Sequence, residues 1–225
     1  MISIKAILTF RSDLCKKKNM QQDTRQLIDE LLKITEWATS TAGKFRELST
    51  AQLNYREQEG SWSILECLEH LNLYGDFYLP EIQKEILSST PSAGPGIFKS
   101  GLIGNYFANL MKAVPGTMKK MKSPKDKNPV NAKLTITTID RFLKQQEMLK
   151  SLLLQASNCD LVKAKTAISL SRFVRLRLGD TFRFFVYHIE RHVMQAQRLV
   201  NEVHAVQTKS PDNVFDMAGA GKNIR

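Results

Sequence analysis

Four segments of the sequence repeat apolar residues at steps of three and four, which is the spacing of one face of an α-helix. They lie at residues 27–45, from 63 onward, at about 135–156 and at 178–203. An amphipathic helix must bury its apolar face against another element. Four such segments therefore predict an all-α fold built as a four-helix bundle.

Residues at the expected helix ends support this division. Ser63 and Glu66 form the pattern of a capping box, in which the hydroxyl accepts from the third helical amide and the carboxylate accepts from the cap amide. Pro80 has no amide hydrogen, so we expect it to kink the second helix or to end its first part. Asp180 or Thr181 can cap the fourth helix, because both side chains accept hydrogen bonds from free amides.

A long insertion at residues 88–134 separates the second helix from the third. It begins with a turn-rich run at 88–96 and contains a short amphipathic stretch at 103–111. A crossover of this length lets the third helix take a non-adjacent position in the bundle. The alternating residues at 160–178 are compatible with a short hairpin or with an extended linker.

The bundle domain is expected at residues 23–207. It is flanked by an N-terminal tail at 1–22, which is expected to be disordered, and by a C-terminal tail at 208–225, in which disorder is expected from Phe215 to Arg225. Because Met20 directly precedes the first helical pattern, the chain can start at Met1 or at Met20.

Composition points to the cytoplasm and away from a membrane-spanning protein. No stretch approaches the roughly 18 consecutive apolar residues of a transmembrane helix. The lysines near the N-terminus follow the short apolar run instead of preceding it, which is not the order of a secretory signal. Cys15, Cys67 and Cys159 are odd in number and widely spaced, so no disulfide framework is predicted.

The net charge of +11 is unevenly distributed. Six lysines and no acidic residue lie between Glu85 and Asp126, and a second acid-free stretch carries lysines and arginines at 163–177. Such patches can bind nucleic acid or an anionic membrane surface, or they can form a solvated rim or the mouth of a site for an acidic small molecule. Aromatic residues are not interleaved with the lysines and no nucleic-acid motif is present, so nucleic-acid binding is disfavoured.

Three of the four histidines occupy positions that suggest a metal site. His188 and His192 are four residues apart, so their rings project ~40° apart on one helix face, beside the apolar stripe. His70 has the matching place on the second helix. The alternative is a core histidine with satisfied nitrogens, but two inward imidazoles without a ligand are costly to desolvate. Three converging imidazoles would bind one divalent ion and leave a position open.

Two motifs around these histidines resemble the DinB-like (damage-inducible) superfamily. Residues 62–71 match its W-S-x-x-E-x-L-x-H-L signature, and residues 188–195 match H-x-x-R-H-x-x-Q. The resemblance implies an up-up-down-down four-helix bundle over roughly residues 24–207, commonly a homodimer. It also implies that His70, His188 and His192 hold one ion: zinc is the first expectation, with nickel, iron or manganese as alternatives.

The resemblance leaves three functions open. Members look like metal-dependent hydrolases or thiol S-transferases, so a small-molecule substrate and a low-molecular-weight thiol are the expected partners. An anionic thiol would suit a basic rim made by Arg172, Arg175, Arg177 or the lysines at 112–125. The second reading is a non-catalytic metal-binding stress-response protein or binding module, and the third is a basic surface for nucleic acid or membranes.

Overall fold

The computed structural model describes residues 20–89, 96–113, 121–169 and 171–209, without the side chains of 172 and 203–209. The tails predicted at 1–22 and 208–225 lie almost entirely outside these residues. The first described element is a strand, β1 (Gln21–Asp23), which starts two residues before the predicted domain boundary. None of the described helices is long and apolar enough to cross a membrane.

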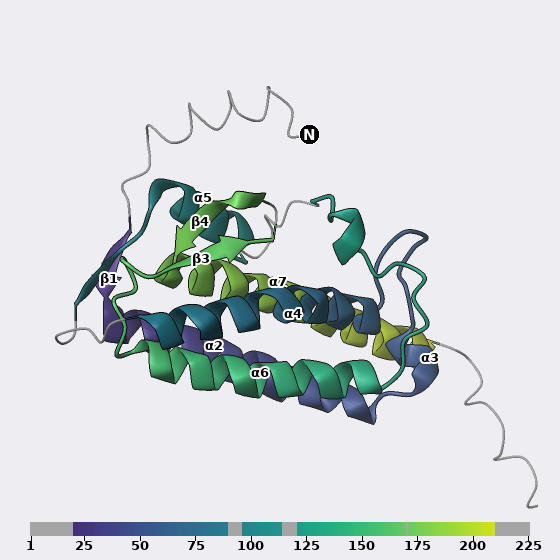
Figure 1. Ribbon diagram of the computed structural model, residues 1–225. Coiled ribbons are helices and arrows are strands. Elements are labelled where there is room, and N and C mark those ends of the chain that lie inside the picture. The colour runs from purple at the N-terminus through teal and green to yellow at the C-terminus, as the bar shows by residue number, and fades with distance from the viewer. Residues whose placement is uncertain (1–19, 90–95, 114–120, 170, 210–225) are drawn as a thin grey trace, which may run out of the picture.

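Four long helices form the bundle that the periodicity predicts (Figure 1). They are α2 (Thr24–Lys44), α4 (Ile64–Ser88), α6 (Thr137–Ala156) and α7 (Leu178–Lys209). Helices α2 and α4 each pack against both α6 and α7, so α2 and α4 occupy opposite corners. Leucine, isoleucine and phenylalanine side chains from all four helices fill the core between them. The prediction of an all-α bundle is confirmed.

Ring contacts along α4 and α7 show that these two helices are antiparallel. Tyr78 lies against Phe185, with ring centroids 5.5 Å apart. Two turns earlier on α4, His70 lies against His192, 4.7 Å away and two turns later on α7. Residues nearer the N-terminus of α4 therefore face residues nearer the C-terminus of α7, turn by turn.

Helices α4 and α6, in contrast, are parallel. The Asn72 side chain donates to the Thr138 carbonyl near the start of both helices, and Ser89 contacts Cys159 just beyond their ends. Helix α2 has the opposite direction to α4 (Figure 1). The order is therefore up-down-down-up, and the predicted up-up-down-down order is wrong. The long crossover returns the chain along the bundle, so that α6 lies beside α4 in the same direction.

The start of α4 has the predicted capping box. The Ser63 hydroxyl accepts from the Glu66 amide at 3.2 Å, and the Glu66 carboxylate accepts from the Ser63 amide at 2.9 Å. Pro80, however, does not end the helix, which continues to Ser88. Both Pro80 and Asp76, whose carbonyl loses its helical partner, are exposed, so water can satisfy that carbonyl.

The predicted cap of the fourth helix is wrong. Helix α7 already begins at Leu178, and Asp180 lies fully buried in its first turn. There its carboxylate accepts from the Gly101 amide at 2.8 Å and from the Ser100 hydroxyl, and it pairs with buried Arg183. Asp180 therefore holds the insertion against α7 instead of capping the helix.

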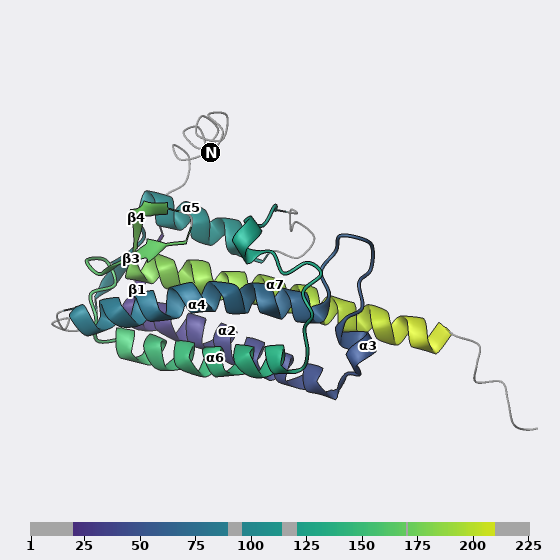
Figure 2. The same ribbon diagram turned by 45° about the vertical axis from the view of Figure 1, so that its right-hand side comes forward.

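The insertion contributes structure of its own on one side of the bundle (Figure 2). Strand β2 (Ile97–Lys99) pairs antiparallel with β1, and α5 (Leu102–Met111) packs on α7. The 3₁₀ turn η2 (Lys125–Lys127) follows. Of the two possibilities for residues 160–178, the hairpin is present: β3 (Lys165–Ile168) pairs antiparallel with β4 (Ser171–Arg177). The short elements η1 (Phe45–Glu47) and α3 (Thr50–Leu53) join α2 to α4.

Candidate metal centre

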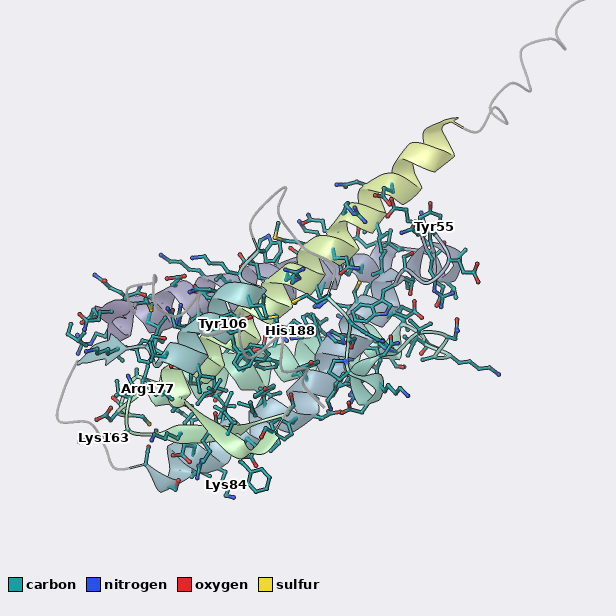
Figure 3. All side chains as sticks on the ribbon, turned by 90° about the horizontal axis from the view of Figure 1, so that it is seen from above. Tyr55, Lys84, Tyr106, Lys163, Arg177 and His188 are labelled. Atoms are coloured by element: carbon teal, nitrogen blue, oxygen red, sulfur yellow. The ribbon has the colours of Figure 1, made fainter. Side chains whose placement is uncertain are left out.

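The antiparallel packing of α4 and α7 brings the three predicted histidines together. His70 comes from α4, and His188 and His192 from successive turns of α7. Their side chains are 3%, 4% and 9% exposed, respectively, so all three rings are buried. Figure 3 shows His188 in the middle of the molecule, away from both ends of the bundle. All three residues predicted as metal ligands thus lie at one place.

The ring nitrogens are spaced as ligands of one ion would be. The Nε2 atoms of His70 and His188 are 3.1 Å apart, and one nitrogen from each of the three rings lies within 4.8 Å of the others. Two ligand nitrogens on a tetrahedral zinc ion are separated by about 3.3 Å, given zinc–nitrogen bonds of ~2.0–2.1 Å. The donor set therefore fits a small divalent cation.

Hydrogen bonds orient two of the three rings. His70 Nδ1 lies 2.6 Å from the Lys127 carbonyl oxygen, and His192 Nδ1 lies 3.0 Å from Gln195 Oε1. Both oxygens are acceptors, so each Nδ1 carries the proton and each Nε2 keeps a free lone pair. The Nδ1 atom of His188 is buried and has no hydrogen-bond partner among the described residues.

Burial keeps these imidazoles neutral. It lowers the pKa of His70 to about 4, although the bond to the Lys127 carbonyl acts in the opposite direction. Burial also lowers the pKa of His188 and His192 far below the ordinary value, and the neighbouring histidines lower both further. A histidine that binds a metal must be a neutral imidazole with one nitrogen free of a proton, so all three are in the ligating form at neutral pH.

Aromatic rings form the walls of the cluster. The Trp62 indole lies 4.5 Å from the His70 ring and 5.4 Å from the His192 ring, and the Tyr74 ring lies 4.5 Å from that of His188. The indole nitrogen donates to Asn128 Oδ1 at 3.1 Å. Aromatic walls exclude water from the ring edges and so strengthen electrostatic interactions inside the site.

Sequence reasoning missed the part that the insertion plays at this site. Residues 121–131 lie over the start of α4. The Lys127 carbonyl accepts a hydrogen bond from His70, and the Asn128 side chain accepts one from Trp62. The Asn131 amide donates to Glu66 at 2.8 Å. Most of these contacts use main-chain atoms, which leave no signature in the sequence. The Gln195 side chain, in contrast, contacts His192 as its position in the second motif suggests.

Glu66 and Glu190, two carboxylates near the histidines in sequence, are not ligands here. Glu66 accepts from Arg56 at 2.7 Å and 2.8 Å as well as from the Ser63 and Asn131 amides. Burial raises the pKa of Glu66, but these hydrogen bonds together lower it by more, so the net shift of the pKa is downward. Glu190 is half-buried, and its pKa is raised by burial. Neither belongs to the cluster of possible ligands around the histidines.

Two arginines of the predicted basic rim form contacts with other parts of the chain. Arg175 pairs with Glu85 on α4 at 3.1 Å, and Arg177 donates to the Lys99 carbonyl. The side chain of Arg172 lies outside the described residues. Lys127, on η2, has its ammonium group 6.0 Å from the ring of Tyr74, one of the walls of the cluster.

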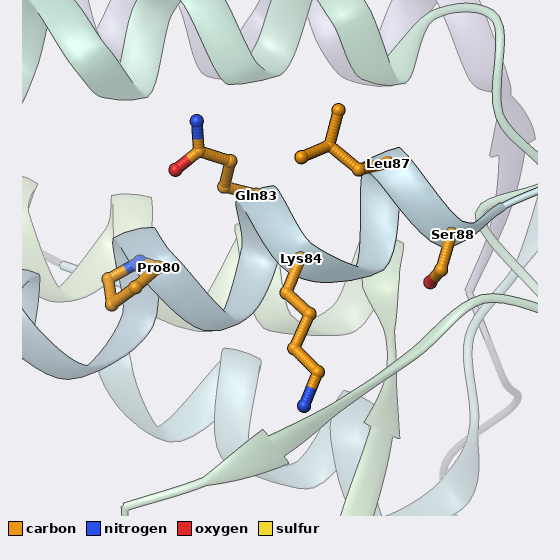
Figure 4. Close-up of a pocket in the computed structure, with 5 residues that line it drawn as sticks. All are labelled: Pro80, Gln83, Lys84, Leu87 and Ser88. Atoms are coloured by element: carbon orange, nitrogen blue, oxygen red, sulfur yellow. The ribbon is translucent and has the colours of Figure 1, made fainter.

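A separate surface hollow lies near the end of α4 and is lined by Pro80, Gln83, Lys84, Leu87 and Ser88 (Figure 4). Pro80, its nearest lining residue, is ten residues beyond His70, which is about 15 Å along a helix. Of the lining side chains, only that of Lys84 carries a charge, and none is a usual metal ligand. The hollow therefore gives no reason to move the candidate site away from the histidines.

Comparison with known proteins gives one match. A family model described as the DinB superfamily matches residues 34–196, well over half of the chain, and this span includes all three histidines. Neither the curated proteins nor the solved structures that were searched contain a match to the chain.

Proposed function

The chain belongs to the DinB superfamily, and from this premise we propose that it is a metal-dependent enzyme acting on a small molecule. His70, His188 and His192 hold one divalent ion, with zinc preferred over nickel, iron or manganese. The reaction is a thiol S-transfer or a hydrolysis. The observation that carries the proposal is the convergence of three buried, neutral imidazoles, with two Nε2 atoms 3.1 Å apart.

Three protein ligands are the number found in catalytic zinc sites, whereas structural sites use four. Among the described residues, no carboxylate or thiol joins the cluster as a fourth ligand. When bound, an ion with an open position acts as a Lewis acid and lowers the pKa of a thiol or of water. The same ligands serve both reactions.

Residues around the histidines supply the remaining functions. The Lys127 carbonyl and Gln195 hold their rings with Nε2 free, and Trp62 and Tyr74 exclude water from the ring edges. The Lys127 ammonium beside Tyr74 would attract an anionic substrate, which suits a low-molecular-weight thiol that carries carboxylates.

The first test is elemental analysis of purified full-length protein and of His192→Ala. We expect close to one equivalent of metal in the wild type and near zero in the variant. The Glu190→Gln variant, altered on the same helix but outside the cluster, is the matched control and should keep the metal. Wild-type protein that binds no metal when supplied with zinc, nickel, iron or manganese would rule out the proposal.

Turnover separates an enzyme from a non-catalytic metal-binding protein. Monochlorobimane with a panel of small thiols tests S-transfer, and simple amides and esters test hydrolysis. We expect activity that a chelator abolishes, that added metal restores and that His192→Ala lacks. Tight metal binding without turnover on any of these substrates would instead favour the non-catalytic function.

A further inference from the structure

Helix α5 exposes an apolar face to solvent. Its inward face, with Gly104 and Ala108 at the contact, packs on α7. On the outward side, Leu102 is 52% exposed, and Ile103 and Leu110 are each 41% exposed. Figure 3 looks onto this side of the molecule, with Tyr106 labelled there. A contiguous set of large, exposed apolar side chains on one helix is typical of a surface that contacts a protein, a membrane or a ligand.

The surroundings of this face are basic and free of carboxylates in sequence. No acidic residue occurs at positions 86–125, which supply β2 and α5. Lys99, Lys122 and Lys125 within this stretch are exposed. Figures 1 and 2 both place η2, in which Lys125 and Lys127 flank the exposed carboxylate of Asp126, on the same side of the bundle as α5.

The adjacent hairpin extends the same character. Strand β4 contacts α5, and residues 161–179, which form the hairpin, also lack any acidic residue. Phe173 on β4 is 97% exposed, the highest value among the large apolar side chains described. Two neighbouring elements thus expose large apolar residues in a setting of positive charge.

We propose that this surface docks the protein onto an anionic phospholipid bilayer. The apolar part of the docking face consists of Leu102, Ile103, Leu110 and Phe173. The exposed lysines Lys99, on the strand before α5, and Lys122, in the segment that follows α5 in the sequence, supply positive charge. Apolar side chains on the outward face of a helix insert at the boundary of headgroups and acyl chains, while neighbouring lysines attract anionic headgroups. Because no described helix spans a membrane, the protein would lie on the bilayer surface.

Charge favours a bilayer over a second copy of the chain. In a two-fold interface the same patch meets itself, so this face would bring lysines of both copies together without a carboxylate from either segment. A nucleic acid would satisfy the lysines, but it would leave the exposed leucines without apolar contact. An anionic bilayer satisfies both the lysines and the apolar residues.

The test is flotation of the full-length protein with vesicles of phosphatidylcholine, with and without phosphatidylserine. We expect binding only to vesicles that contain phosphatidylserine, weakening as salt increases. The double variant Leu102→Gln/Leu110→Gln should reduce binding by roughly tenfold or more, because both substitutions remove apolar surface that would be buried in the bilayer. Lys99→Gln and Lys122→Gln should each reduce it by roughly fivefold at low salt.

Leu154→Gln is the matched control, because Leu154 is also 52% exposed but lies on α6, which does not belong to this face. This variant should bind vesicles as the wild type does. Three results would overturn the proposal: absence of binding to phosphatidylserine vesicles, an equal loss in the Leu154→Gln control, or conversion of a dimer to a monomer by the α5 variant. Circular dichroism of each variant establishes that it is folded.

Discussion

The Nδ1 atom of His70 donates a hydrogen bond of 2.6 Å to the main-chain carbonyl of Lys127, 57 residues further along the chain. The Lys127 ammonium returns to the same helix and donates to the Leu73 carbonyl at 3.0 Å. The insertion is therefore attached to α4 at two points, one of which sets the tautomer of a candidate metal ligand. A segment that looks like a connecting loop in the sequence is part of the site.

We expect Lys127→Met to weaken metal binding by up to roughly tenfold, which is the lower end of the loss seen when support for a ligand is removed. The carbonyl remains in the variant, but the bond to Leu73 that holds it in place is lost. Lys125→Met, in the same turn but exposed, is the control and should bind normally. Competition with a chromophoric chelator measures both affinities, and equal values would contradict the role of the Lys127 side chain.

Gln195→Leu should reduce metal affinity by about 10- to 100-fold. The substitution removes the oxygen that accepts from His192 Nδ1 at 3.0 Å, so the ring loses the bond that fixes its tautomer. Gln197→Leu is the matched control, because Gln197 is exposed two residues further on the same helix. The same chelator competition applies, and unchanged affinity in Gln195→Leu would show that packing alone orients the ring.

The stability of the metal-free protein should depend on the protonation of the histidines. The pKa of His70 is about 4 in the folded protein against 6.5 for a free side chain, because the ring is buried. Between these values the unfolded chain binds a proton that the folded protein does not. The free energy of unfolding should therefore be constant above pH 6.5 and fall as the pH decreases toward 4, by on the order of 3 kcal/mol for this residue.

Urea denaturation of chelator-treated protein at a series of pH values measures this dependence. His188 and His192 shift in the same direction and add to the slope. In His70→Phe the ring no longer titrates, so the decrease between pH 6.5 and 5, where few carboxylates titrate, should be shallower. A wild-type profile that is flat over this interval would contradict the lowered pKa values.

Gly104→Ala should destabilise the protein by about 1–3 kcal/mol. A β-carbon at this position would lie 2.4 Å from the Asp180 carboxylate, which is held by its bonds to Ser100, Gly101 and Arg183 and cannot easily move. Gly43→Ala is the control. A β-carbon there meets no atom within 4 Å, so the free energy of unfolding of this variant, measured by urea denaturation, should increase by about 0.5–1 kcal/mol.

The sequence predicted local features well, because they depend on residues close together in the chain. The capping box at Ser63 and Glu66 is present, since it needs only four consecutive residues in a helical start. The prediction for Asp180 failed for the opposite reason. Its carboxylate meets partners about 80 residues away at Ser100 and Gly101, and no local pattern reveals that competition.

Helical periodicity by itself determined that this protein is an all-α bundle, and the spacing of His188 and His192 placed both rings on the inner face of one helix. Only the tertiary structure decided the up-down-down-up order, since periodicity says which face is buried but not in which direction a neighbouring helix points. That order sets the register between α4 and α7 and so brings His70 to the other two histidines. It also brings the Lys127 carbonyl to His70, a main-chain contact that no side-chain pattern encodes.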